Sequence, residues 1–210
     1  MSLKPVATLV AFVITAGALI VQIILTVSTQ LSHGESLISA LVFYFSFFTI
    51  TSNLMLAAIY LSDLIAWRWL EWWRTPWVRG MMAGAIALVM AVYHFLLFGL
   101  ADIDIWFIIA DRTLHYVDPV LYIVWWLAVV PHGRLRWGQI PLMLVYPLVY
   151  IAYAMARGAV TALYPYPFLA ADKLGYAQVA INCVFMFVGV IAIYAAVIWL
   201  DRLLQRRQPA

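Results

Sequence analysis

The sequence has 210 residues, of which 67% are hydrophobic and only 10% are charged, with a mean hydropathy of +1.00. A soluble domain carries roughly a quarter charged residues, so this composition excludes soluble enzymes and disordered chains and indicates an integral membrane protein. The net charge of +3 is too small to indicate a nucleic-acid partner. The single cysteine, Cys183, can form no internal disulfide and has no second thiol for a metal cluster.

Six apolar stretches are long enough to cross a bilayer as helices, which takes about 20 predominantly apolar residues. They are residues 5–26, 37–61, 78–100, 114–130, 139–156 and 177–200. The first is longer than the apolar region of a signal peptide and has no small-x-small cleavage site, so we expect it to remain in the protein. The sequence therefore predicts an all-α fold, a single domain over residues 1–210 built as a bundle of six transmembrane helices.

The positions of Lys and Arg predict the orientation of these helices. Nine of the 12 lie at the N-terminus, in the second and fourth connections and in the C-terminal tail: Lys4, Arg68, Arg74, Arg79, Arg134, Arg136, Arg202, Arg206 and Arg207. The other connections hold Arg112, Arg157 and Lys173. Basic residues favour the cytoplasmic side, so we expect both termini in the cytoplasm.

Three connections have distinctive compositions. The second carries a cluster of tryptophans beside its arginines, which is typical of an anchor at the membrane interface: Trp67, Trp69, Trp72, Trp73 and Trp77. In the third, Asp102, Asp104 and Asp111 flank an apolar segment, 105–110, that could dip toward the membrane as a lid. The fifth, Tyr164–Phe168, contains two prolines and offers apolar area to a protein surface or to lipid headgroups.

Polar residues form stripes on two of the predicted spans. At about 100° per residue, the second span places Ser46, Thr49, Ser52 and Asn53 on one face and Thr51 on the other. The fourth places its polar residues at i, i+4, i+7 and i+11, with Pro119 bending or starting the helix. These are Asp111, His115, Asp118 and Tyr122.

Polar residues also occur on the remaining spans. The first has Thr15, Gln22 and Thr26, the third His94, the fifth Tyr146, Tyr150, Tyr153 and Arg157, and the sixth Gln178 and Asn182. We expect these stripes to line one polar cavity toward the non-cytoplasmic side, because ionisable groups within a membrane usually mark function. The alternative is structural: hydroxyls bond a carbonyl one turn back, tyrosines pack with a polar tip, and Arg157 and Asp111 snorkel or pair near span ends.

Several short motifs resemble the androgen-induced and androgen-dependent TFPI-regulating protein family, in particular its bacterial branch. They are Phe48-Thr49-Ile50-Thr51-Ser52-Asn53, His115-Tyr116-Val117-Asp118-Pro119, Tyr146-Pro147 with Tyr150, Arg157-Gly158 and the Tyr164–Phe168 connection. The resemblance covers nearly the whole chain and implies a location in the bacterial inner membrane. Animal members are threonine hydrolases that cleave fatty acid esters of hydroxy fatty acids.

The resemblance implies Thr49 as nucleophile and His115 as base, with Thr51 as the alternative nucleophile. In this hypothesis Asp118 or Asp111 orients the imidazole, and Asn53 stabilises the oxyanion. Ser46 is a supporting residue on the same polar face as Thr49 and Asn53. Arg157 would bind a fatty-acid carboxylate. Lipids or lipid-like esters are the expected partners, no cofactor or metal is expected, and the oligomeric state stays open.

Two other classes of function compete with ester hydrolysis. A transporter or channel could use Asp111, His115, Asp118 and Arg157 as an outward-facing site, although the sequence has no clear internal repeat or broken span. A haem-binding bundle could use His94 and His115, because both lie near the outer ends of successive spans.

Overall fold

The computed structural model describes residues 3–65, 67–99 and 104–205, and these residues form helices and short connections without strands. The all-α prediction is thus confirmed over the described chain. Four helices are long and apolar enough to cross a membrane, and a fifth candidate is a pair of helices joined by a sharp bend. The chain divides into two compact units, Met1–His132 and Gly133–Ala210, each of which is described by itself.

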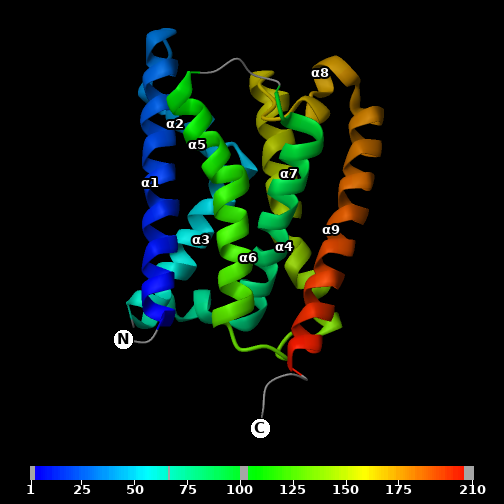
Figure 1. Ribbon diagram of the computed structural model, residues 1–210. Coiled ribbons are helices and arrows are strands. Elements are labelled where there is room, and N and C mark those ends of the chain that lie inside the picture. The colour runs from blue at the N-terminus through cyan, green and yellow to red at the C-terminus, as the bar shows by residue number, and fades with distance from the viewer. Residues whose placement is uncertain (1–2, 66, 100–103, 206–210) are drawn as a thin grey trace. The chain divides into compact units, whose positions relative to one another are not determined.

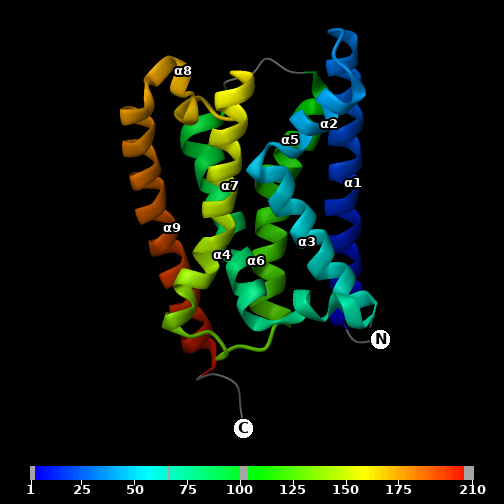
Figure 2. The same ribbon diagram turned by 180° about the vertical axis from the view of Figure 1, so that it is seen from behind.

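The first unit is built around a long helix near the N-terminus. Its elements are α1 (Leu3–Ser32), α2 (Leu37–Phe45), α3 (Phe48–Leu64), the 3-10 helix η1 (Arg68–Arg74), α4 (Pro76–Val92), the π-helix η2 (Tyr93–Leu97), α5 (Ile105–Arg112), the π-helix η3 (Thr113–Val117) and α6 (Asp118–Val129). Helices α3, α5 and α6 all contact α1, and α4 packs on α3 and α6 (Figures 1 and 2). A buried apolar cluster joins these elements near the middle of α1: Ala18, Leu19, Tyr44, Ile50 and Leu114.

The second predicted span is not one continuous helix. Helix α2 begins at an N-cap, where Ser36 accepts a hydrogen bond from the Ser39 N–H, and it ends at Ser46. Helix α3 starts two residues later, bent by 77° from α2. The Ser46 hydroxyl and N–H both donate to the carbonyl of Phe43, which satisfies that carbonyl outside the α-helical pattern. The prediction of an unbroken helix over 37–61 was therefore wrong.

The fourth predicted span begins earlier than the sequence indicates. Elements α5, η3 and α6 follow one another without a break over 105–129, and Pro119 occupies the first turn of α6. Residues 105–110, predicted to form a lid, are instead the start of this helical stretch, whereas Asp102 lies outside the described residues. The π-helix η3 also rotates the residues after it about the helix axis, because its hydrogen bonds run from residue i to residue i+5.

The second unit is an antiparallel pair of long helices with a folded connection. It contains the 3-10 turn η4 (Trp137–Gln139), α7 (Ile140–Thr161), the 3-10 turn η5 (Pro167–Leu169), α8 (Ala171–Leu174) and α9 (Tyr176–Gln205). Helix α7 packs on α9, and the Leu135 N–H donates to Asp201 over 2.8 Å. The Tyr164 ring lies against Gly158 so closely that a Cβ there would meet it at 2.1 Å. A residue larger than glycine would therefore displace this connection.

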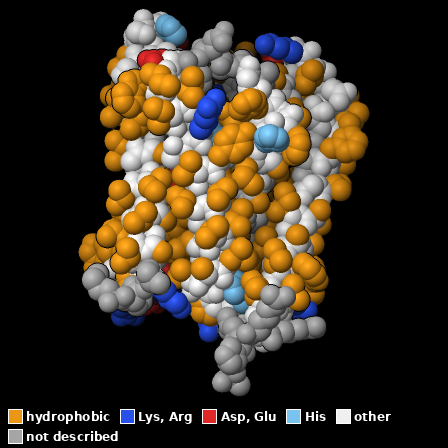
Figure 3. All heavy atoms as spheres, viewed as in Figure 1, with side chains coloured by type: hydrophobic (Ala, Val, Ile, Leu, Met, Phe, Trp, Pro, Cys, Tyr) orange, Lys and Arg blue, Asp and Glu red, His pale blue; other side chains and the backbone are white. Residues whose placement is uncertain are grey.

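The outer surface of the first unit is that of a membrane protein. Apolar side chains cover most of the face formed by α1, α5 and α6 in Figure 3. Large residues there include Val13 and Ile20 on α1, each 58% exposed, and Val124 on α6, 57% exposed. Such a continuous apolar face is costly in water but not in hydrocarbon, so the helices are suited to lie in a bilayer.

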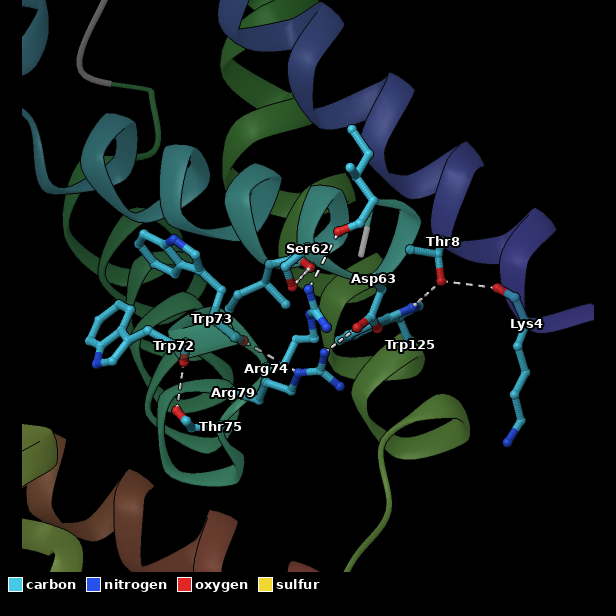
Figure 4. A network of polar contacts seen from close by, with 12 residues as sticks. Lys4, Thr8, Ser62, Asp63, Trp72, Trp73, Arg74, Thr75, Arg79 and Trp125 are labelled. Atoms are coloured by element: carbon cyan, nitrogen blue, oxygen red, sulfur yellow. Dashed lines mark hydrogen bonds and ion pairs between the residues drawn. The ribbon is translucent and has the colours of Figure 1, made fainter. Parts of the chain in front are cut away.

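Charged residues are held at the end of the first unit where α1 begins. Arg79 on α4 is 7% exposed, pairs with Asp63 on α3, and lies over the Trp125 ring at 5.5 Å (Figure 4). The Trp125 indole donates to Thr8 on α1 over 2.9 Å (Figure 4). This network joins α1, α3, α4 and α6 near the tryptophan-rich η1.

Candidate functional site

Thr49 and His115 lie in direct contact within the first unit. The Thr49 Oγ1 is 3.0 Å from His115 Nε2, although the two residues are 66 positions apart in the chain. Thr49 is the second residue of α3, just after the bend, and His115 is in the π-turn η3. The Thr49 residue is 6% exposed and the His115 side chain 13%. The structure therefore brings together, in a largely buried place, the two residues that the resemblance singles out.

The other imidazole nitrogen determines the proton arrangement of this pair. His115 Nδ1 lies 2.8 Å from the backbone carbonyl of Asp111 and 3.0 Å from its carboxylate Oδ1. Both atoms are acceptors, so Nδ1 carries the proton in the neutral imidazole and Nε2 presents a lone pair. Nε2 then accepts a hydrogen bond from the Thr49 hydroxyl. This is the geometry of a nucleophile, a base and an orienting carboxylate.

Tyr93 completes the surroundings of the imidazole and was not predicted from the sequence. Its ring stacks on that of His115 with centroids 4.1 Å apart and an angle of 21° between the planes. Its hydroxyl donates to Asp111 Oδ2, the carboxylate oxygen that does not face His115. Tyr93 is the first residue of the π-helix η2, directly after α4. Its position near the outer end of an apolar span was the available signal, since tyrosine carries a polar tip.

Asn53 connects the helices that carry the pair. Its Nδ2 donates to the carbonyl of Thr49 over 2.9 Å and to that of Leu114 over 3.2 Å, and its Oδ1 is buried without a partner. Both amide hydrogens are therefore occupied, so the expectation that Asn53 donates to an oxyanion does not fit the geometry. Because Leu114 precedes His115, Asn53 instead holds α3 against η3.

Ser46, predicted on the same face as Thr49, and Thr51, the alternative nucleophile, both donate to backbone carbonyls. Ser46 is buried at the end of α2 and donates to Phe43, so the bend separates it from the face of α3 that carries Thr49. The Thr51 hydroxyl donates to the carbonyl of Phe48 over 3.1 Å, a bond one turn back along its own helix. Thr49 is thus the threonine of this motif that contacts His115.

Asp118 and Tyr122 belong to a different contact region from Asp111 and His115. The carboxylate of Asp118 accepts a hydrogen bond from Thr15 on α1 over 3.0 Å, and its Oδ2 is buried without a partner. The Tyr122 hydroxyl donates to the carbonyl of Arg79 over 3.0 Å. The π-turn between His115 and Asp118 breaks the predicted single stripe. Asp111, rather than Asp118, is the carboxylate in contact with the imidazole.

Two further predicted cavity residues of the first unit lie away from the pair's contacts. The exposed His94 has its Nδ1 3.1 Å from the Tyr116 hydroxyl. Gln22 donates to Thr26 on its own helix over 3.1 Å, and its Oε1 is buried without a partner. Neither residue has a hydrogen bond to Thr49 or His115 among those described.

The remaining predicted residues belong to the second unit, where they hold the connection between α7 and α9. Arg157 donates to the carbonyl of Leu163 over 2.6 Å, and Asn182 donates to that of Phe168 over 2.9 Å. Tyr150 is buried with its ring 6.5 Å from Tyr166. Tyr146 is half-buried and Tyr153 is 40% exposed. That these residues share a cavity with Thr49 stays a prediction.

The described residues include no cluster of three or more His, Cys, Asp or Glu side chains that could hold a metal ion. Comparison with known proteins gives no significant match to a family model, a curated protein or a solved structure.

Proposed function

We propose that the protein is an intramembrane threonine hydrolase that cleaves lipid esters. The observation that carries this proposal is the 3.0 Å contact between Thr49 Oγ1 and His115 Nε2, with His115 Nδ1 directed at Asp111. Such a contact activates a hydroxyl as a nucleophile, because the imidazole can take its proton as the new bond forms.

The reaction proceeds through an acyl-enzyme. Thr49 Oγ1 attacks the ester carbonyl carbon while its proton passes to His115 Nε2, and the collapsing intermediate expels the alcohol, which takes that proton. Water then attacks the acyl-threonine, giving its proton to His115, and the fatty acid leaves as Thr49 recovers its hydrogen. The sum is ester plus water to acid plus alcohol, without any other reactant.

The bend before α3 supports oxyanion stabilisation. The first N–H groups of a helix have no acceptor within that helix, and they carry the positive end of its dipole. Thr49 and Ile50 are the second and third residues of α3, so their N–H groups are placed beside the nucleophile itself. We assign the oxyanion site to these N–H groups, in place of the Asn53 amide.

The substrate is an ester with long acyl chains. The unit that carries the pair has an exposed apolar face, and the pair lies level with the apolar cluster at the middle of α1. An ester reaching this depth must be soluble in hydrocarbon. Membership of the androgen-induced and androgen-dependent TFPI-regulating protein family would narrow it to fatty acid esters of hydroxy fatty acids.

The proposal includes six spans and both termini in the cytoplasm of a bacterial cell. The fourth span, the stretch 105–129, is added to the four long helices and the bent pair, because it is continuous although each of its helices is short. Cysteines introduced singly at Ser36 and Thr75, in a chain with Cys183→Ser, test the topology. We expect an impermeant maleimide to label the cysteine at 36 in intact cells, and the cysteine at 75 only after lysis. The opposite pattern would reverse the orientation.

Labelling by a long-chain fluorophosphonate tests the chemistry. In purified protein in nanodiscs we expect labelling of Thr49, loss of labelling in Thr49→Ala and His115→Gln, and retention in Thr51→Ala. The Thr51→Ala variant is the matched control, because it removes a threonine hydroxyl two residues away, from the other face of the same helix. Labelling that survives Thr49→Ala would disprove the assignment.

A transporter is the second candidate, because the break between α2 and α3 is the kind of interrupted helix found at transporter binding sites. The buried hydrogen bond between Thr49 and His115 favours hydrolysis. Proton or anion flux into liposomes, measured beside ester turnover in the same preparation, separates the two. A haem site at His94 and His115 is disfavoured, since both His115 nitrogens already have protein partners.

A further inference from the structure

The ring of Tyr93 is held rigidly beside the imidazole. Tyr116 packs edge-on against it with centroids 5.2 Å apart, and Phe98 does the same at 6.0 Å. Tyr93 itself is 8% exposed. Because two further rings pack against it, the Tyr93 ring is a firm surface for the nearly parallel face of His115 at 4.1 Å. The plane of the imidazole is therefore defined by α4 and η2, not only by its own helix.

The hydroxyl of Tyr93 acts on the same imidazole by a second route. It donates to Asp111 Oδ2 while His115 Nδ1 faces Asp111 Oδ1, so the carboxylate is held between a phenol and an imidazole. An aspartate side chain with one partner can rotate, whereas one bound at both oxygens keeps its plane. A fixed carboxylate adds to the backbone carbonyl of Asp111, which lies 2.8 Å from the same nitrogen, in favouring the imidazole tautomer with its proton on Nδ1.

We propose that Tyr93 is a positioning residue for the Thr49–His115 pair, which orients the imidazole by ring stacking and selects its tautomer through Asp111. This inference rests on the proposed hydrolase function for its kinetic consequence only. The stacking and the carboxylate contact make a prediction about the His115 tautomer that holds whether or not the protein cleaves an ester.

Two substitutions separate the contributions of the ring and the hydroxyl. Tyr93→Phe keeps the stacking and removes the donor to Asp111, whereas Tyr93→Leu removes both. Tyr116→Phe is the matched control, because it removes a tyrosine hydroxyl beside the same ring while that hydroxyl contacts His94 and not Asp111. Elution volume and thermal unfolding of each variant show whether it is folded.

The test is nitrogen NMR of the full-length protein in nanodiscs with labelled histidine, the His115 signals being assigned by their loss in His115→Gln. We expect Nδ1-protonated imidazole in the wild type and in Tyr116→Phe, and a mixture of tautomers in Tyr93→Phe. Fluorophosphonate labelling should fall about tenfold in Tyr93→Phe and about a hundredfold in Tyr93→Leu, with KM for an ester unchanged.

The labelling experiment and the NMR experiment can fail independently of each other. A wild-type protein that the probe does not label would refute the proposed hydrolase, and the NMR comparison would still decide the role of Tyr93. If Tyr93→Phe and Tyr93→Leu are folded and keep the wild-type tautomer, Tyr93 only fills space and the inference is wrong.

Discussion

The Asn53 side chain donates to the carbonyl of Leu114 over 3.2 Å, across 61 positions of the chain. Through this bond α3 is attached to the residue immediately before His115, and a second bond attaches the same amide to the carbonyl of Thr49. Nucleophile and base therefore share one buried crosslink. Their 3.0 Å separation depends on a residue that touches neither reacting atom.

Asn53→Ala should move the pair apart without altering either member. The substitution removes two hydrogen bonds in a fully buried place, where each acceptor left unsatisfied costs about 1–3 kcal/mol. We expect a lower unfolding temperature and labelling slowed at least tenfold. Thr51→Ala, on the same helix, should keep the wild-type labelling rate. Full labelling of folded Asn53→Ala would show that the crosslink does not position the pair.

The two aspartates of the fourth span should differ in their effect on the reaction. Asp111→Asn keeps the shape of the side chain but presents an amide to His115 Nδ1, which disturbs the tautomer that the base needs. We expect acylation to slow about a hundredfold, within the range for loss of a general-base contribution. Asp118→Asn should have little effect on the rate, because that carboxylate contacts Thr15. Measured acylation rates that rank the variants in the opposite order would return the orienting role to Asp118.

Thr15 should be important for folding rather than for chemistry. It donates to a carboxylate that is fully buried and has no partner at its second oxygen. Thr15→Val removes the donor at nearly constant volume and should destabilise the protein by about 1–3 kcal/mol. In the background of Asp118→Leu the same substitution should cost much less, which a double-mutant cycle of unfolding free energies measures. Equal costs in both backgrounds would mean that the bond contributes nothing.

Sequence periodicity predicted the helical class and most of the apolar stretches because both follow from composition over long windows. It failed where the backbone departs from a regular α-helix. The bend after Ser46 has no proline or glycine to announce it. The π-helix η3 ends just before Asp118-Pro119, where the proline marks an irregularity but not the rotation of the residues that follow. Asp118 and Ser46 were therefore grouped with the wrong neighbours. Tyr93 was missed because a single tyrosine in an apolar stretch gives no sign of its contact with Asp111.

Periodicity placed Thr49 and His115 on polar stripes, but their pairing came only from the resemblance, since one contact across 66 positions has no local signal. The partners of His115 are a different case. Asp111 was one of two carboxylates predicted to orient the His115 imidazole. It lies four residues before His115, and a helix brings side chains at this spacing onto one face. The spacing of four between Asp111 and His115 therefore predicted a contact correctly. The spacing of seven between Asp111 and Asp118 did not, because it crosses the whole π-helix η3.

The Arg79–Asp63 pair should be a principal support of the end of the bundle where α1 begins. Arg79 is 7% exposed, and its guanidinium also donates to Trp73 and lies over the Trp125 ring. Removing one member of a buried pair leaves an uncompensated charge, and because the Asp63 side chain keeps 22% exposure we expect Arg79→Met to cost about 2–3 kcal/mol. In the Asp63→Asn background the same change should cost clearly less. Chemical unfolding in detergent, followed by tryptophan fluorescence, gives the four free energies of the cycle. An interaction energy near zero would place the stabilisation in the cation–π contact with Trp125 instead, which Trp125→Leu in the same cycle would reveal.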